Sequence, residues 1–369
     1  MSQDLGDELA TQVQKAFAEK QTLRIVGSGS KLLLGRTVVG ESLDITRHRG
    51  IVEYAPTELV ITARAGTPLL EIEEALAERG QMLPFEPPHL GDGATLGGTI
   101  ACGLSGPRRP YAGSARDFTL GLRMINGRGE VLGFGGQVMK NVAGYDVSRL
   151  MVGAQGTLGV LLDISLKVLP RPACDRTLQV DMDASTAIET MPHLTNLALP
   201  LSAACHLPAT QQQAAHCCLR LSGEEVAIEA AVTTVQKALS DFSIIEKENG
   251  DESRLFWQAL RERRLPFFTD TDALWRLSVP PATSVFDETR LSGECLLDWG
   301  GAQRWLKTDA RIDVVQKAAQ KLGGHATLYN QQGAIPAPLN PVLEKVHRQV
   351  KIAFDPAGIL NPGRLYAAL

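Results

Sequence analysis

Glycine is concentrated in one part of this chain, and this clustering restricts the fold more than any other feature of the sequence. Of the 35 glycines in 369 residues, 17 lie between Gly91 and Gly159, under a fifth of the chain. They follow no G-x-y period, which excludes a collagen helix. Glycine permits backbone conformations that other residues avoid and lets a ligand approach backbone N–H groups closely. The clustering therefore predicts loops, and three of them point to a bound ligand.

The rest of the composition limits the class of protein. A chain of this length can hold about two domains with buried cores. Its net charge of −4 and its 5% of aromatic residues argue against a nucleic-acid-binding protein, which needs a basic face or a stacking surface. No segment approaches the roughly 18 apolar residues of a membrane span, and residues 1–8 lack the basic and apolar regions of a signal peptide. We therefore expect a cytoplasmic protein.

The six cysteines show neither a C-x-x-C pair nor the spacing of metal ligands. We expect them to be reduced and buried. The chain is therefore predicted to carry no metal site and no iron–sulfur cluster of the usual sequence type. These cysteines are Cys102, Cys174, Cys205, Cys217, Cys218 and Cys295.

Apolar periodicity predicts an α+β chain, with a domain boundary where two prolines flank an arginine at residues 170–172. Apolar residues recur every four positions from residue 5 to residue 17 and predict a first helix. A second helix is expected over residues 67–79, with Thr67 as its N-cap and Pro68 at its first position. Further helices are expected over residues 226–242, 253–263, 310–322 and 341–351, and strands over residues 23–26, 42–46, 51–54, 59–64, 120–126, 130–134, 160–168, 273–279 and 293–299.

The first glycine-rich loop follows the short strand at residues 23–26 and reads G-S-G-S at residues 27–30. Successive N–H groups in such a loop bind anions, phosphates above all. The loop lacks the G-x-G-x-x-G pattern of a Rossmann site because residue 32 is leucine, and Lys31 lacks the glycine spacing of a P-loop. An ordinary tight turn and a phosphate-binding loop both remain open for this segment.

Two further glycine-rich segments favour a ligand. In residues 95–106, small residues leave little side chain to pack, which favours close approach of a flat or phosphorylated ligand over a structural turn. A third segment runs from residues 140–146 to residues 153–160, where glycines alternate with strand-forming residues, as expected for strands pressed against a ligand. Three such loops within about 130 residues predict one large cofactor.

These segments, in this order, resemble the FAD-binding domain of the vanillyl-alcohol oxidase family, also called the PCMH type. V-G-S-G-S at residues 26–30 matches the pyrophosphate loop of that family, and T-L-G-G-T-I-A at residues 95–101 matches its T-[IL]-G-G-x-[IVL]-A motif. Three more segments resemble family motifs: Y-A-G-S-A-R-D at residues 111–117, Q-G-T-L-G-V at residues 155–160, and the closing D-P through N-P-G-R at residues 355–364.

The resemblance covers residues 20–172 and 350–366, a little under half the chain. It implies an α+β fold with a PCMH-type, two-lobed FAD-binding domain at residues 1–170. A smaller α+β cap domain would occupy residues 171–335. The C-terminal segment, residues 336–369, would pack back on the FAD-binding domain.

Within that family, residues 139–146, 274–280 and 354–366 are similar to the E subunits of bacterial glycolate oxidases. This resemblance implies a complex with a larger catalytic flavoprotein D subunit and an iron–sulfur F subunit. The complex would oxidise glycolate, with D-lactate as a further candidate, to the 2-oxo acid and pass electrons to the iron–sulfur partner rather than to oxygen. Any attachment to the inner membrane would be peripheral, through these partners.

The resemblance also implies which residues bind the cofactor. Residues 27–30 would cradle the pyrophosphate, and Asn361 would return near the flavin ring. The FAD would be held without a covalent bond, because no histidine lies near the pyrophosphate loop. For Arg116 and Asp117 a surface ion pair is the alternative, and Lys140 and Asn141 are further candidates. The predicted FAD contacts are Val26, Gly27, Ser28, Gly29, Ser30, Thr95, Gly97, Gly98, Ala101, Gly103, Ser105, Arg116, Asp117, Gly156, Thr157, Gly159, Val160 and Asn361.

Catalysis by the chain itself is a separate question. Oxidation of a 2-hydroxy acid needs a base for the hydroxyl proton and a cation for the carboxylate. None of the seven histidines forms a ligand pair. His325 and Arg276 are the candidates, with a packed or surface histidine as the alternative for His325 and a loop histidine for His89. Three hypotheses stay open: an FAD-binding subunit that leaves oxidation mainly to its partner, a self-sufficient D-2-hydroxy-acid dehydrogenase, and a flavin-free scaffold.

Overall fold

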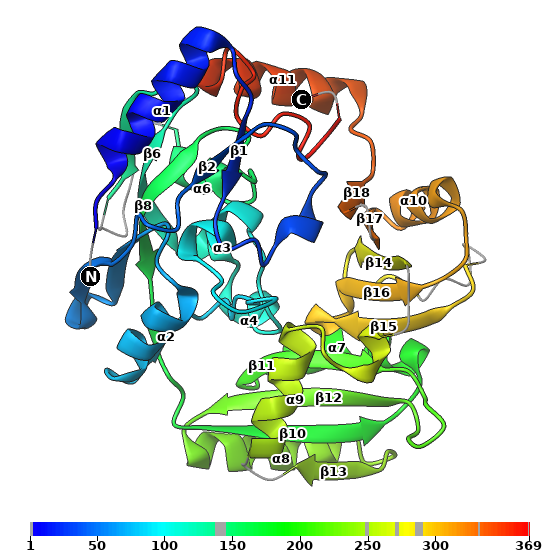
Figure 1. The fold of residues 1–369 in the computed structure, drawn as a ribbon. Coiled ribbons are helices and arrows are strands. Elements are labelled where there is room, and N and C mark those ends of the chain that lie inside the picture. Colours follow the sequence, from blue (N-terminus) through cyan, green and yellow to red (C-terminus); the bar gives the residue numbers. More distant parts are fainter. Residues whose placement is uncertain are drawn as a thin grey trace.

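The computed structural model describes residues 3–136, 145–247, 251–269, 273–284, 291–330, 333–367 and 369. The chain forms two lobes built on separate β-sheets (Figure 1). The first lobe contains a five-stranded sheet, and the second lobe contains a nine-stranded sheet. Among the described residues, no helix is long and apolar enough to cross a membrane.

The sheet of the first lobe is antiparallel, in the order β3-β4-β8-β6-β7. Its central strand β8 buries most of its side chains, and the predicted hairpin forms between β6 and β7. The bounds are β3 Ile51–Ala55, β4 Val60–Arg64, β6 Thr119–Ile125, β7 Val131–Gly135 and β8 Val160–Lys167.

Helices and two small strand pairs complete the first lobe. The predicted first helix is α1, Gly6–Glu19, which buries Leu9 and Val13 in the lobe's core. Strands β1 and β2 pair in parallel, and β5 pairs with β9. The bounds are β1 Leu23–Val26, β2 Glu41–Asp44, β5 Gln81–Met82, β9 Leu169–Pro170, α2 Leu69–Ala77, α3 Leu96–Cys102, α4 Arg109–Ala112, α5 Ala115–Phe118 and α6 Val147–Met151, with the 3-10 turns η1 Leu32–Leu34 and η2 Pro56–Glu58.

Helices cover both faces of the second sheet, whose order is β13-β10-β12-β11-β15-β16-β14-β17-β18. Helices α7, α8 and α10 pack in one core, whereas α9 packs on the other face. The bounds are β10 Cys174–Asp181, α7 Ala184–Thr195, β11 Leu201–Leu207, β12 His216–Gly223, α8 Glu225–Ala238, β13 Ile244–Lys247, α9 Asp251–Arg261, η3 Pro266–Phe268, β14 Ala273–Ser278, β15 Glu294–Asp298, η4 Trp299–Gly301, β16 Gln303–Lys307, α10 Ile312–Lys321, β17 His325–Asn330 and β18 Gly333–Pro336.

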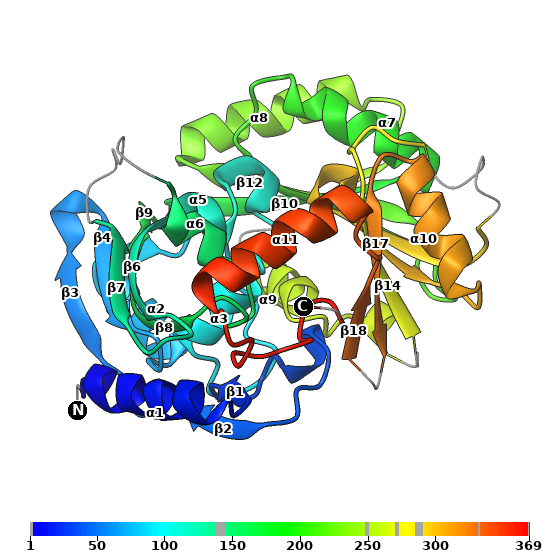
Figure 2. The same ribbon diagram turned by 90° about the horizontal axis from the view of Figure 1, so that it is seen from above.

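The C-terminal segment returns from the second lobe to the first. Helix α11, Pro341–Phe354, crosses between the lobes (Figure 2). The tail then pairs with β1, where the Leu23 N–H donates to the Ile359 carbonyl at 2.8 Å and the Asn361 N–H donates to the Leu23 carbonyl at 3.0 Å. This contact brings the last segment of the chain beside the first strand.

Two local predictions were wrong. Helix α2 begins at Leu69, and Thr67 does not cap it, because the Thr67 Oγ1 accepts the Gly50 N–H at 2.9 Å instead. Residues 153–159 form a turn rather than strands, since the strand β8 starts only at Val160. Gly153 and Gly156 of that turn, with φ of 87° and 72°, adopt left-handed conformations that are incompatible with a strand.

Candidate functional site

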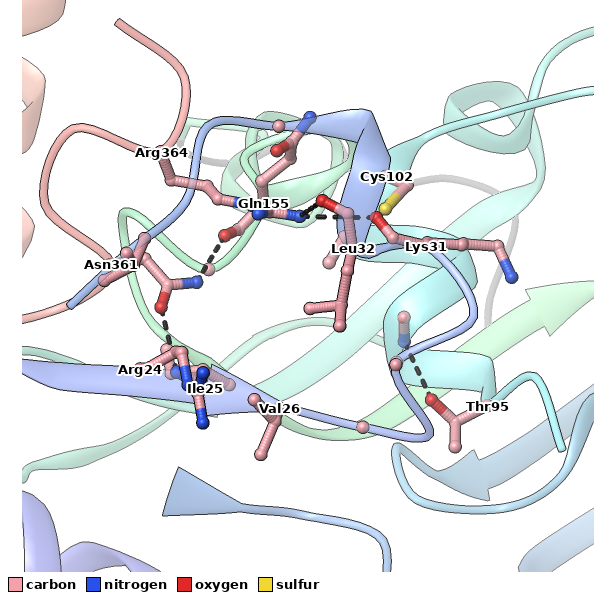
Figure 3. A pocket seen from close by; sticks show the side chains of 18 of the residues that line it. Arg24, Ile25, Val26, Lys31, Leu32, Thr95, Cys102, Gln155, Asn361 and Arg364 are labelled. Atoms are coloured by element: carbon pink, nitrogen blue, oxygen red, sulfur yellow. Dashed lines mark hydrogen bonds between the residues drawn. The ribbon is translucent and has the colours of Figure 1, made fainter. Parts of the chain in front are cut away.

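A groove crosses the first lobe where four segments that are distant in the sequence meet. Its walls are the loop after β1, the start of α3, the turn before β8 and the C-terminal tail (Figure 3). The groove encloses about 1170 Å³ of space, its open side included. Gly333 of β18 also lines it, so the second lobe reaches its rim.

The start of α3 forms one wall of the groove. Thr95 is the N-cap, and its Oγ1 accepts the Gly98 N–H at 3.2 Å. The Gly97 N–H donates to the Ala65 carbonyl at 2.7 Å. A Cβ on Gly97 would lie 2.7 Å from the Ala65 Cβ, so only glycine lets α3 approach the sheet this closely.

A substitution at Gly97 tests this packing. We expect Gly97→Ala to push α3 off Ala65, lowering the free energy of unfolding by about 1–3 kcal/mol and reducing the flavin bound per chain. Gly133→Ala is the matched control, because a Cβ there meets nothing within 4 Å. Urea titration and the ratio of flavin to protein absorbance measure the two effects. Equal stability and flavin content in the two variants would contradict the prediction.

The loop after β1 forms the facing wall. Gly29 has a left-handed φ of 84°, and a Cβ on Gly27 would lie 2.8 Å from the Thr95 Oγ1. Lys31 follows, and its buried Nζ donates to the His89 carbonyl at 3.0 Å. Burial lowers the pKa of Lys31. The nearby Cys102 and Glu262 raise it and offset part of this lowering. The loop thus offers closely spaced backbone N–H groups beside a buried amine.

Asn361 joins three walls of the groove. Its Oδ1 accepts the Ile25 N–H at 2.8 Å, and its Nδ2 donates to the Gln155 carbonyl at 2.7 Å. The Gln155 side chain in turn donates from Nε2 to the Leu34 carbonyl at 2.9 Å. The Gln155 Oε1 is buried and has no hydrogen-bond partner among the described residues. A polar atom left in this way beside a groove is suited to accept a hydrogen bond from a ligand.

Arg364 of the tail fixes the loop after β1. Its guanidinium donates to the Arg36 carbonyl at 2.8 Å and to the Leu32 carbonyl at 2.9 Å. Figure 3 shows this side chain reaching over the groove toward Gln155 and Leu32. The shape of the anion-binding loop therefore depends on a residue more than 300 positions away.

The structure brings twelve of the predicted FAD contacts together in the lining of the groove. They come from four separate segments of the sequence, which only the fold makes neighbours. These residues are Val26, Gly27, Ser28, Gly29, Ser30, Thr95, Gly97, Gly98, Ala101, Gly156, Gly159 and Asn361.

Six other predicted contacts lie outside the lining of the groove, and two of them serve the end of α3. Gly103 ends that helix with a φ of 63° and packs against Gly153. The Ser105 Oγ accepts the Ala115 N–H at 3.0 Å. Both residues therefore shape the loop after α3 rather than line the groove.

The remaining four have structural partners of their own. Asp117 forms a capping box with Ser114, and the Arg116 guanidinium donates to the Val152 carbonyl at 3.4 Å. The Thr157 hydroxyl donates to the Ala154 carbonyl at 2.7 Å, and Val160 is buried in the core. Lys140 and Asn141 lie outside the described residues.

The lining residues that the sequence interpretation missed include Lys31, Cys102, Gln155 and Arg364. Gln155 and Arg364 stand inside segments that the interpretation quoted, so the signal was present. The sequence interpretation selected mainly small residues as FAD contacts, because a glycine-rich loop is itself a sign of a bound cofactor. The direction of a long side chain depends on its tertiary partners, and these were not visible in the sequence.

A smaller chamber lies between the two lobes. It encloses about 340 Å³ of space, its open side included, and Leu104–Pro107, the stretch just beyond α3, forms part of its wall on the first lobe. Arg263, Arg276, Asp298 and Gln303 line it from the second lobe. The candidate Arg276 therefore faces a cavity, whereas His325 stands exposed at the start of β17 and is not part of the lining.

Trp299, next to the lining residue Asp298, links the second lobe to the first. Its Nε1 donates to the Gly106 carbonyl at 3.0 Å. The guanidinium carbons of Arg109 and Arg276 lie 4.3 Å and 5.3 Å from its ring centroid, within the range of cation–π contacts. Trp299 and the two glycines after it all have positive φ, which explains the W-G-G sequence at this turn.

Comparison with known proteins decides the family. A model described as an FAD binding domain matches residues 6–135, and one described as the C-terminal domain of FAD linked oxidases matches residues 302–365. The chain is 48% identical to glycolate oxidase subunit GlcE of Escherichia coli (strain K12), over 99% of each chain. The chain belongs to the GlcE family.

Two more distant likenesses concern a glycolate oxidase D subunit and the fold. Glycolate oxidase subunit GlcD of Bacillus subtilis (strain 168) is 26% identical over 92% of this chain and 83% of its own. The crystal structure of p-cresol methylhydroxylase with substrate bound has a TM-score of 0.73 at 14% identity, covering 99% of this chain and 88% of its own. At that identity the likeness concerns the fold alone, and it establishes the expected PCMH-type α+β architecture.

The groove of this GlcE-family chain suits FAD. The matched FAD-binding domain contains its loop after β1 and the start of α3. A long, flat dinucleotide needs small residues along its length, which Gly27, Gly97 and Gly98 supply. Its phosphates need N–H donors and positive charge, which the loop and Lys31 provide, and the unpartnered Gln155 Oε1 is an acceptor for its hydroxyl or amine groups.

Proposed function

We propose that this chain is the FAD-binding subunit of a complex that oxidises glycolate to glyoxylate. The proposal is carried by the groove of glycines, Lys31 and Gln155 together with the likeness to GlcE along the whole chain. Bound in the groove, FAD would supply the hydride-accepting chemistry that oxidation of a hydroxy acid needs. The glycines, Lys31 and Gln155 of this chain would hold the cofactor.

We propose that a GlcD-type flavoprotein is one partner and that an iron–sulfur protein is the other. The first is supported by the names of two relatives, which are subunits E and D of glycolate oxidase. The second is supported by electron balance, because oxidation of each glycolate releases two electrons. The described cysteines are all free thiols, and no group of three metal-ligating side chains occurs in the described part of the chain. Peripheral attachment to the inner membrane would come through these partners.

A second candidate function is independent oxidation of a D-2-hydroxy acid. The chamber favours it, because Arg276 and Arg263 are cations that could hold a substrate carboxylate. The third hypothesis, a scaffold without flavin, conflicts with the open groove and its unpartnered Gln155 Oε1. The domain limits of residues 1–170, 171–335 and 336–369 remain part of this proposal.

One experiment separates these functions. The chain is purified alone, its flavin spectrum is recorded, and glycolate or D-lactate is added with an artificial electron acceptor. We expect bound FAD that glycolate reduces only after a GlcD-type partner and an iron–sulfur partner are added. Bleaching by the isolated chain would favour the independent dehydrogenase, and absence of flavin would favour the scaffold.

The attachment of the flavin is a separate prediction. No histidine lines the described groove, so we expect the FAD to be non-covalent and released by acid. After precipitation with acid, yellow colour should remain in the supernatant. Colour that stays with the precipitated protein would show a covalent bond.

A further inference from the structure

The chamber between the lobes has an excess of positive charge. Burial lowers the pKa values of Arg109 and Arg263, and the nearby positive charge of Arg276 lowers both further. Neither Arg263 nor Arg276 forms an ion pair with a carboxylate in the described part of the chain; instead Arg263 stacks on the rings of Trp305 and Tyr329. Buried guanidinium groups without counterions favour binding of an anion.

Among the described residues that line the chamber, Asp298 carries the one carboxyl group, and two hydrogen bonds through Gln303 join it to Arg276. The Asp298 Oδ1 accepts the Trp299 N–H at 2.7 Å, and its Oδ2 accepts from the Gln303 Nε2 at 3.1 Å. The Gln303 Oε1 then accepts the Arg276 Nε–H at 2.8 Å. In this arrangement, Arg276 offers its Nε–H to the protein rather than to a ligand.

Protonation of Asp298 reverses the donor and acceptor roles of the Gln303 amide in these two hydrogen bonds. The Trp299 N–H is a fixed donor to Oδ1, so the added proton must sit on Oδ2, facing Gln303. The Gln303 amide must then turn to offer its oxygen to that proton, and its NH₂ group faces Arg276. Arg276 loses its acceptor, which frees Nε–H and a neighbouring Nη–H to bind a carboxylate in a bidentate pair. The loss of a negative charge favours the anion as well.

Asp298 is also poised to change charge near neutral pH. Burial raises its pKa to about 7 against the hydrogen bonds from Trp299 and Gln303. Other groups that face it keep one charge state there: Arg220 and Arg108 outweigh burial to hold the pKa of Glu86 low, whereas burial raises the pKa values of Tyr111 and Cys205. Partial burial and the nearby charge of Arg276 lower the pKa of His325, so that this imidazole is neutral above pH 7.

We propose that Arg276 binds the carboxylate of a small acid in this chamber, and that binding is coupled to protonation of Asp298 through the Gln303 amide. Arg276 touches the acid, whereas Asp298 and Gln303 are positioning residues. The proposal rests on the proposed function only for the class of acid, a 2-hydroxy acid. The anion site itself does not depend on turnover.

Binding of oxalate to the FAD-loaded full chain tests the proposal without turnover. Oxalate is a two-carbon dicarboxylate with no hydrogen to transfer. Calorimetry in two buffers of different ionisation enthalpy counts the protons taken up. We expect uptake that approaches one proton per oxalate above pH 7, and a Kd that rises up to tenfold per pH unit there. Binding without proton uptake, or no binding at any pH from 6 to 9, overturns the proposal.

Variants separate the roles of Asp298 and Arg276. Asp298→Asn should bind oxalate with a Kd independent of pH and without proton uptake, because asparagine resembles the protonated acid. Arg276→Gln should lose binding at every pH. The controls are Asp313→Asn and Arg311→Gln, exposed residues near α10 that should behave as wild type. Proton uptake that persists in Asp298→Asn, or full affinity in Arg276→Gln, contradicts the proposal. If Asp298→Asn fails to fold, the wild-type proton count still decides.

The test of oxalate binding and the test of glycolate oxidation can fail independently of each other. A chain that binds oxalate with proton uptake but shows no reduction by glycolate with partners present would retain this inference and reject the proposed function. A complex that oxidises glycolate while its E-type chain binds no oxalate would do the reverse.

Discussion

Replacing Lys351 by methionine is expected to lower the free energy of unfolding by about 3–5 kcal/mol and to release most of the bound FAD. The Lys351 Nζ is buried and donates to three oxygens at 2.7 Å: the Thr157 carbonyl, the Leu360 carbonyl and the Asp355 Oδ2. Removing the amine leaves the fully buried Asp355 carboxylate without its cation. Such an uncompensated buried charge is among the largest single-residue penalties.

The same substitution should affect the cofactor because Lys351 ties α11 to two walls of the groove. Thr157 belongs to the turn that contains Gly156, and Leu360 precedes Asn361. Thermal unfolding and the flavin-to-protein absorbance ratio report the two losses. Lys345→Met, on the exposed face of the same helix, is the matched control and should change neither. Full flavin content in Lys351→Met would show that the groove forms without this amine.

The second large effect is expected at Glu86, which joins the two lobes. Its carboxylate accepts from the Arg108 Nε at 3.2 Å in the first lobe and from the Arg220 Nη2 at 2.9 Å on β12 of the second. The Glu86 side chain is only 16% exposed. Glu86→Gln leaves two mostly buried guanidinium groups without a carboxylate between them, so we expect a loss of about 3–5 kcal/mol and weaker coupling of the lobes in thermal unfolding.

This effect has a defined pH dependence. Burial raises the pKa of Glu86, but Arg220 and Arg108 outweigh it and hold the pKa below the usual value. A carboxyl whose folded pKa is depressed contributes stability above its unfolded pKa, about 4.3, and loses it as the pH falls through the folded value. The difference between wild type and Glu86→Gln should therefore be full at pH 7 and shrink below about pH 4. Glu74→Gln, exposed on α2, is the control, and an equal difference at pH 3 and pH 7 would contradict the mechanism.

Much of the local structure could be predicted from the sequence. The four-residue apolar period of α1 and the G-R-G turn between β6 and β7 identified those elements because their patterns depend only on near neighbours. The cap of α2 was misjudged for the opposite reason. Thr67 has the right chemistry for an N-cap, but its hydroxyl is taken by Gly50, a partner that only the folded chain supplies.

For the site, the sequence by itself determined where the walls of the groove consist of glycine backbone. Glycines in order along the chain specify where a backbone can approach a dinucleotide, because the absence of Cβ is a property of each residue alone. This is why so many of the predicted glycines line the groove, and why Gly103, needed instead for the end of α3, could not be told apart from them.

The tertiary structure alone decided which charged and polar side chains take part. Gln155 and Arg364 lie 209 positions apart, yet both reach the loop after β1, and Lys351 stabilises the same walls from behind. Likewise Arg276 was a candidate from the sequence, but only the pairing of β14, β15 and β16 placed it beside Gln303 and Asp298. Long side chains take their direction, and buried acids their pKa, from neighbours that are remote in the sequence, and these neighbours exist only after folding.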